Sequence, residues 1–160
     1  MGIESIITIT PYSWKAVGAT IFCGSIIGLE RQLRGKPVGI RTSALITLGT
    51  YIFCQSAQLI TNDLTDPSRV IGQVITGIGF LGAGVMLARD GAVIGVTSAA
   101  TIWVLAAIGV AIYVGSIAVA IKLSFLTVFI LYGVDLLEEH TMTFSRGVHN
   151  RYLSRKQRSE

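Results

Sequence analysis

Three carboxylates, Glu30, Asp90 and Asp135, each follow a long apolar stretch of the chain. This placement puts each carboxylate at or just past the C-terminus of a predicted helix. A carboxylate there opposes the helix dipole by about 0.3 to 1 kcal/mol at an exposed position. Helix propensity therefore does not explain these three residues, and we expect them to have cationic partners.

Cationic and hydroxyl side chains are available at the same predicted depth. Arginines flank the carboxylates, and hydroxyls open the fourth predicted helix, where the first backbone N–H groups lack helical partners. We therefore predict a polar cytoplasmic cluster beneath a helical bundle. Its members are Glu30, Arg31, Arg34, Arg41, Arg89, Asp90, Thr97, Ser98, Thr101 and Asp135.

Two kinds of chemistry fit this cluster. Hydrated Mg²⁺ keeps several of its waters and takes only one or two protein carboxylates, so Glu30, Asp90 and Asp135 are candidate metal ligands. The alternative is a set of ordinary salt bridges that fixes the first loop against the third. No cofactor besides Mg²⁺ is indicated, because Cys23 and Cys54 stand alone in apolar stretches and form no metal-binding motif.

A second polar layer is predicted near the other end of the bundle. Gln55, Gln73 and Lys122 each lie about six residues inside a predicted span, which corresponds to about 9 Å below the outer boundary. Such a layer fits an outward-facing vestibule. It equally fits an interhelical hydrogen-bond cluster from which Lys122 extends outward to the interface.

Four glycines, Gly77, Gly79, Gly82 and Gly84, include a G-x-G-x-x-G pattern. In a soluble βαβ unit this pattern would indicate dinucleotide binding. Here it lies inside an apolar stretch with no strand before it. In lipid, glycines let helix backbones approach closely, so we predict a helix-packing surface. The alternative is a locally unwound helix that forms a binding site.

The composition indicates that lipid solvates most of the chain. Hydrophobic residues make up 51% of its 160 residues and charged residues only 14%, which is too apolar for an ordinary soluble domain. The net charge of +4 does not predict nucleic-acid binding, because the basic residues are not interleaved with aromatics on one face. The sequence contains no catalytic motif, and we predict that the protein is not an enzyme.

Five segments are long enough to cross a bilayer as helices, which requires about 17 to 25 residues. The last apolar stretch is too long for one crossing, and Gly115 with Ser116 is the break that we predict within it. The fold class is therefore an all-α integral membrane protein, a compact bundle of five transmembrane helices in residues 1–137, followed by a basic cytoplasmic tail, 138–160. The predicted spans are 12–29, 42–60, 67–88, 97–114 and 116–137.

The distribution of Lys and Arg predicts the orientation. Cytoplasmic loops carry an excess of these residues. The first and third loops and the tail hold ten of them, and only Lys15 and Arg69 flank the spans on the other side. The N-terminus is therefore expected outside and the C-terminus in the cytoplasm, which requires an odd number of spans.

Two stretches of the sequence resemble a known family. They are GLERQLRGKPVGIRTSALITLG at 28–49, and 66–109 with DPSR, GIGFLGAGVML and TSAATIWVLAAIG. These segments resemble the MgtC/SapB family of bacterial inner-membrane proteins. The sequence departs from the MgtC branch at Thr97, Ser98 and Val104, and 23 residues follow Leu137, so it is more similar to the short SapB-like members.

The resemblance implies a multi-pass protein of the bacterial inner membrane that is linked to adaptation to low Mg²⁺. Two functions are compatible with it. One is a regulatory membrane module that contacts a second copy of itself, as a homodimer, or another membrane protein through glycine-lined helices. The other is a transporter or channel for Mg²⁺ or another small ion. No acidic residue is predicted near the middle of the bilayer, which favours the regulatory module.

Overall fold

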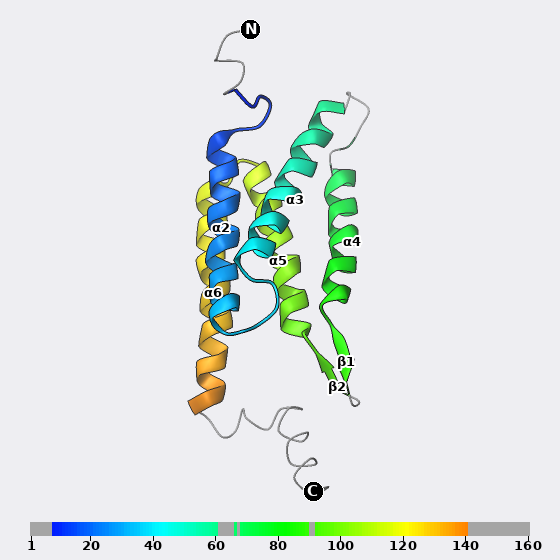
Figure 1. The fold of residues 1–160 in the computed structure, drawn as a ribbon. Coiled ribbons are helices and arrows are strands. Elements are labelled where there is room, and N and C mark those ends of the chain that lie inside the picture. Colours follow the sequence, from blue (N-terminus) through cyan, green and yellow to red (C-terminus); the bar gives the residue numbers. More distant parts are fainter. Residues whose placement is uncertain (1–7, 61–65, 67, 90–91, 141–160) are drawn as a thin grey trace, which may run out of the picture.

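The computed structural model describes residues 8–60, 66, 68–89 and 92–140. Within these residues the chain forms five helices and one short β-hairpin (Figure 1). The helices run alternately up and down, so that α2 begins at one end of the bundle and α6 finishes at the other. The elements are α2 (Trp14–Leu33), α3 (Ile40–Ile60), α4 (Ser68–Gly84), β1 (Leu87–Arg89), β2 (Ala92–Ile94), α5 (Val96–Tyr113) and α6 (Ile117–His140).

The hairpin corrects the expectation of an all-α chain. The sequence predicted helix as far as residue 88, but α4 ends at Gly84 and the antiparallel strands β1 and β2 follow, with Leu87 paired to Ile94. Gly95 follows β2 and precedes α5, and it has a φ of 91°. A side chain at this position would collide with the Val85 carbonyl oxygen, so the return into α5 requires glycine.

A second glycine separates the last two helices. Gly115 has a φ of 85°, which lies in the left-handed region that glycine adopts without steric cost. Its N–H donates to the Ile112 carbonyl at 3.0 Å, and the N–H of Ser116 donates to the Ala111 carbonyl at 3.0 Å. These bonds satisfy carbonyls at the end of α5 and allow the chain to reverse into α6.

Glycines also set the close packing of α2 and α5 against α3. A Cβ at Gly24 would lie 2.7 Å from the Cα of Ala44, and one at Gly28 would lie 2.6 Å from the Cα of Ile40. On α5, a Cβ at Gly109 would lie 2.7 Å from the carbonyl oxygen of Thr47. The backbones approach so closely that no larger residue fits, which is the packing mode of membrane helices.

Large aliphatic side chains fill the centre of the bundle. Ile27 of α2 and Ile102, Leu105 and Ile108 of α5 are all less than 2% exposed. They belong to a core to which α2, α3, α5 and α6 contribute. Helix α4 lies at the edge, where it packs mainly against α5 and where Gly82 is its one buried residue.

Two of the described helices are long and apolar enough to span a membrane by length and composition, Val96–Tyr113 and Ile117–Leu136. The second is largely exposed in the isolated chain, and Phe125, Phe129 and Ile130 each expose more than half of their surface. Contiguous apolar surface of this kind is unfavourable in water and favourable against lipid. The structure therefore has a helical bundle with an apolar exterior.

Candidate functional site

Helices α2 and α6 bring charged residues together at the end of the bundle where both helices finish. The two helices pack side by side (Figure 1). Glu30 and Arg31 lie in the last turn of α2, and Arg34 is the residue that caps its C-terminus. Tyr132 and Asp135 lie near the end of α6. Positions 101 residues apart therefore become neighbours.

Arg34 connects the two helices. Its Nη1 donates a hydrogen bond to Oδ2 of Asp135 at 2.8 Å, and its Nε lies 3.2 Å from Oε1 of Glu30. The guanidinium carbon also lies 4.8 Å from the centre of the Tyr132 ring, a favourable cation–π distance. Arg34 therefore stands between two carboxylates from different helices, and an aromatic face supports it.

Glu30 and Arg31 are charged but buried. Glu30 is 7% exposed and Arg31 is 3% exposed, and Nη1 of Arg31 lies 3.6 Å from Oε2 of Glu30. Among the residues that the structure describes, neither carboxylate oxygen of Glu30 accepts a hydrogen bond, and Nε of Arg31 donates none. The 3.2 Å approach of Arg34 to Glu30 is thus an ion pair without hydrogen-bond geometry. Buried charges that lack hydrogen bonds are costly, typically by about 1 to 3 kcal/mol or more for each group.

The other members of the predicted cytoplasmic cluster lie at the starts of α3 and α5. Arg41 and Thr97 are exposed, whereas Ser98 and Thr101 are buried. The Thr101 hydroxyl donates to the Thr97 carbonyl at 2.8 Å, so its hydrogen is used within its own helix. The side chain of Arg89 and the whole of Asp90 lie outside the described residues. Within the described part of the chain, the charged cluster consists of Glu30, Arg31, Arg34 and Asp135.

Only two of the three predicted metal ligands lie within the described residues. Glu30 and Asp135 face a common arginine, and Asp90 lies outside the described residues. In the described ranges, no group of three or more His, Cys, Asp or Glu side chains could hold a metal ion. A metal at this position would therefore depend on two carboxylates and its own waters.

The predicted outer polar layer is distributed over three helices. Nε2 of Gln55 donates to Oε1 of Gln58 at 3.3 Å on the same helix, α3. Lys122 is exposed on α6, and Gln73 lies on α4. Among the residues that the structure describes, no hydrogen bond joins any two of Gln55, Gln73 and Lys122.

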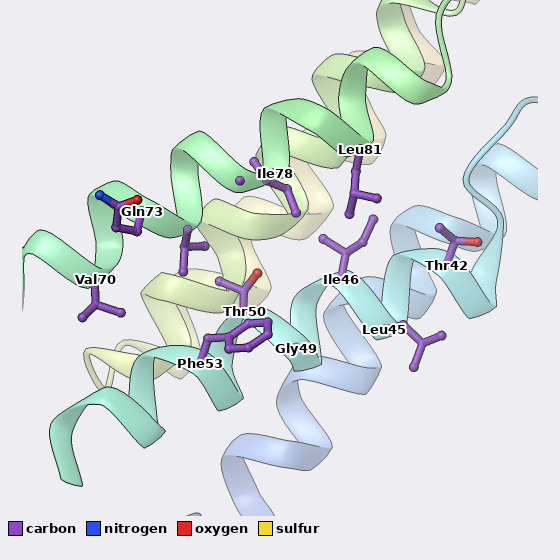
Figure 2. Close-up of a pocket in the computed structure, with 12 residues that line it drawn as sticks. Thr42, Leu45, Ile46, Gly49, Thr50, Phe53, Val70, Gln73, Ile78 and Leu81 are labelled. Carbon is purple, nitrogen blue, oxygen red and sulfur yellow. The ribbon is translucent and has the colours of Figure 1, made fainter. Parts of the chain in front are cut away.

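An apolar groove of about 670 Å³ separates α3 from α4. Ile46 of α3 and Leu81 of α4 point toward one another across it, and Gln73 lies farther along α4 (Figure 2). The groove is lined by Thr42, Leu45, Ile46, Gly49, Thr50, Phe53, Val70, Gln73, Val74, Gly77, Ile78 and Leu81.

The four glycines singled out on α4 differ in their surroundings. A Cβ at Gly82 would contact Ala99 of α5 at 3.7 Å, an ordinary van der Waals distance. At Gly77, Gly79 and Gly84 a Cβ would meet no described atom within 4 Å. These three glycines are therefore open on the surface of α4 instead of packing within the described chain, and Gly77 lines the groove.

Sequence reasoning did not find the glycines that pack most closely or the aromatic partner of Arg34. Gly24 and Gly28 form a GxxxG pair, which is a known signal for close helix contact in membranes. Tyr132 lies three residues before Asp135, and this spacing places both residues on one helix face. Both signals are present in the sequence, but only the helix contacts identify the partners.

Comparison with known proteins gives consistent matches. The profile of the MgtC family matches residues 17–140. A protein of Escherichia coli (strain K12) named "Putative magnesium transporter YhiD" is 43% identical over 124 residues, which cover 73% of this chain and 57% of that protein. An uncharacterized protein of Haemophilus influenzae is 44% identical over 122 residues, which cover 71% of this chain and 50% of that protein.

More distant matches carry the name MgtC. "Protein MgtC" of Brucella abortus (strain 2308) is 39% identical over 104 residues, which cover 61% of this chain and 43% of that protein. The chain thus spans about half the length of the curated relatives it matches. No solved structure matches the chain.

Proposed function

Because this chain belongs to the MgtC family, we propose that it is a regulatory module of the bacterial inner membrane that is linked to magnesium homeostasis. In this proposal the five helices cross the membrane with the N-terminus outside. The module acts through contact with a second copy of itself along α4. The names of its relatives support the link to magnesium and to a membrane.

The apolar core of the helical bundle is the observation that favours regulation over transport. Ile27, Ile102, Leu105 and Ile108 occupy the centre of the bundle with less than 2% exposure. A path for an ion requires polar groups that replace its water shell. Buried apolar side chains offer no ligand to an ion, and close packing around them leaves it little space.

The groove between α3 and α4 supports contact with a second copy. Its lining contains no ionisable side chain, so two copies can face each other across a two-fold axis without like-charge repulsion. Gly77 is open on this face, and a glycine lets another helix approach closely.

Gln73 adds a polar contact to the same surface. The structure describes no hydrogen bond to its amide, which both donates and accepts. Such an amide is complementary to a copy of itself. In lipid, such an interhelical hydrogen bond contributes about 0.6 to 2 kcal/mol to helix association.

A reconstitution and a rescue assay test the proposal together. Purified protein in liposomes should give no protein-dependent Mg²⁺ uptake. In a strain that lacks the gene, the wild type should restore growth in low Mg²⁺, whereas Gly77→Leu, which fills the groove, should not. Gly18→Leu is the matched control, because Gly18 is an exposed helical glycine that also has no neighbour within 4 Å. Rescue by Gly77→Leu at normal protein levels would count against the groove.

A transporter for Mg²⁺ or another small ion is the alternative. The printed name of the Escherichia coli relative favours it, as do the buried charges of Glu30 and Arg31, since ionisable groups within membrane bundles often mark ion paths. Mg²⁺ uptake into liposomes that is lost in Asp135→Asn or Lys122→Leu would establish this alternative and exclude the regulatory module.

A further inference from the structure

The Glu30 carboxylate is the most unusual group in the charged cluster. It is only 7% exposed, yet neither of its oxygens accepts a hydrogen bond from any part of the chain that the structure describes. Arg34 covers it with an ion pair of 3.2 Å and is itself 23% exposed. The carboxylate therefore retains unused capacity for hydrogen-bond donors, and the partly exposed side chain of Arg34 separates it from solvent.

We propose that Arg34 is an exchangeable counter-ion and that a hydrated divalent cation of the Mg²⁺ class takes its place between Glu30 and Asp135. This inference rests on the proposed link to magnesium and names the site. It assigns two residues as ligands and Arg34 as the competitor of the metal.

The distances allow one hydrated ion to reach both carboxylates. Both carboxylates approach the Arg34 guanidinium, at 2.8 Å and 3.2 Å. The two oxygens can therefore be no more than about 8 Å apart, given C–N bonds of about 1.33 Å. Mg²⁺ holds its waters at about 2.1 Å, and each water donates over about 2.8 Å. One hydrated ion can thus reach both carboxylates through its waters, which supply the hydrogen bonds that Glu30 lacks.

Charge explains why the exchange is balanced. With Arg34 in place, two carboxylates face two guanidinium groups, those of Arg31 and Arg34, and the cluster is neutral. A divalent cation must displace Arg34 before it gains the full attraction of both carboxylates. Removal of the Arg34 charge alone leaves the cluster with one excess negative charge, so it should strengthen cation binding.

The route to the site is open from the end of the bundle. Arg34 and Asp135 are partly exposed, at 23% and 32%. The ring of Tyr132 holds Arg34 from the α6 side. In the proposed exchange, Arg34 leaves by rotation of its own side chain, which breaks its contacts with Tyr132 and Asp135 without separating α2 from α6.

Binding of Mn²⁺, a spectroscopic substitute for Mg²⁺, tests the exchange in the purified full chain. Electron paramagnetic resonance measures free Mn²⁺ at fixed ionic strength, and Mg²⁺ is added as the competitor. We expect Arg34→Gln to bind about tenfold more tightly than the wild type, because one opposing charge is removed. Glu30→Gln and Asp135→Asn should each weaken binding by about tenfold or more.

Asp66→Asn is the matched control. Asp66 is an exposed carboxylate whose oxygens already accept the N–H and hydroxyl of Ser68, so its loss should leave the affinity unchanged. Because Glu30 is buried and its variant can fail to fold, Asp135→Asn provides the second, partly exposed test, with helicity checked by circular dichroism. Equal or weaker binding by Arg34→Gln overturns the inference, as does unchanged binding by Asp135→Asn.

The outcome is separable from that of the proposed function. Cation binding by the purified protein does not depend on uptake or on growth. Mg²⁺ uptake with the predicted affinity changes would exclude regulation and leave the exchange site standing. Growth rescue without those affinity changes would support regulation and overturn the exchange site.

Discussion

Arg34, at the C-cap of α2, and Asp135 of α6 form a 2.8 Å charge-assisted hydrogen bond at the end of the bundle where both helices finish. The pair is the shortest polar link between these helices among the described residues. It joins the end of the first described helix to the last helix, and it holds the guanidinium that also faces Glu30. Five measurements test how this pair, the packing around it and the predicted topology behave.

The first prediction concerns the energy of the pair itself. Both side chains are partly exposed, so we expect a coupling free energy of about 0.5 to 1 kcal/mol between Arg34→Leu and Asp135→Asn. A double-mutant cycle from denaturant unfolding in detergent measures it. Strictly additive single effects would show that the contact does not stabilise the bundle.

The second prediction concerns the buried ion pair. Loss of one partner from Glu30 and Arg31 leaves the other charge buried and uncompensated, which costs about 3 to 5 kcal/mol. We expect Glu30→Leu to destabilise the protein by this amount and Glu30→Leu with Arg31→Leu to recover much of the loss. The unfolding free energies of Glu30→Leu and of the double variant, each compared with that of the wild type, test both expectations. A double variant that is less stable than the single one would contradict the prediction.

The third prediction concerns the contact between α2 and α3. Gly28→Ala places a Cβ 2.6 Å from the Cα of Ile40, and such overpacking costs about 1 to 3 kcal/mol. Gly18→Ala is the control on the same helix, where a Cβ meets nothing within 4 Å. It should be neutral or stabilising by up to about 1 kcal/mol, because alanine is the better helix former. Equal effects at both positions would show that the close approach is not required.

The fourth prediction concerns pH and the start of α4. The hydroxyl and the N–H of Ser68 donate to the Asp66 carboxylate at 2.7 Å and 2.8 Å and lower its pKa below 3.8. Because the folded pKa is the lower one, the stabilisation is fully present above the unfolded pKa. It is lost as the pH falls through the folded pKa.

Nuclear magnetic resonance titration of the Asp66 carboxyl carbon measures this pKa. Ser68→Ala removes the hydroxyl, so the pKa of Asp66 should rise toward 3.8 in that variant. The backbone hydrogen bond remains, which makes the variant a test of the hydroxyl alone. An identical titration curve for the two proteins would rule out the hydroxyl as the main cause.

The fifth prediction concerns the threading of the chain through the membrane. An accessibility tag inserted at Asn62 should report the outer side, and a tag after Glu160 should report the cytoplasm. The excess of Lys and Arg in the first and third loops and in the tail is the physical reason. Detection of both tags in one compartment would falsify the three predicted spans between them, and with them the predicted topology and the inner position of the charged cluster.

The sequence by itself determined the helical segments. Long apolar stretches bounded by charged residues or glycine define helices in lipid, because every backbone group must be satisfied within its own segment. Gly115 illustrates this, since the length of the apolar stretch requires a break and glycine permits one. The grouping of Glu30, Arg34 and Asp135 was also predictable in outline, because Lys and Arg placement assigns their helix ends to one side.

Only the tertiary structure decided which of these residues meet. The pairing of Arg34 with Asp135 depends on α2 packing beside α6, and no local pattern encodes that neighbour. The hairpin at Leu87–Ile94 was missed because three-residue strands carry too little periodicity to distinguish them from a helix end. The close contacts of Gly24 and Gly28, and the open face of Gly77, were likewise set by which helix lies opposite each one. Contacts between distant segments depend on the shape of both surfaces, and a single sequence specifies that shape only once it is folded.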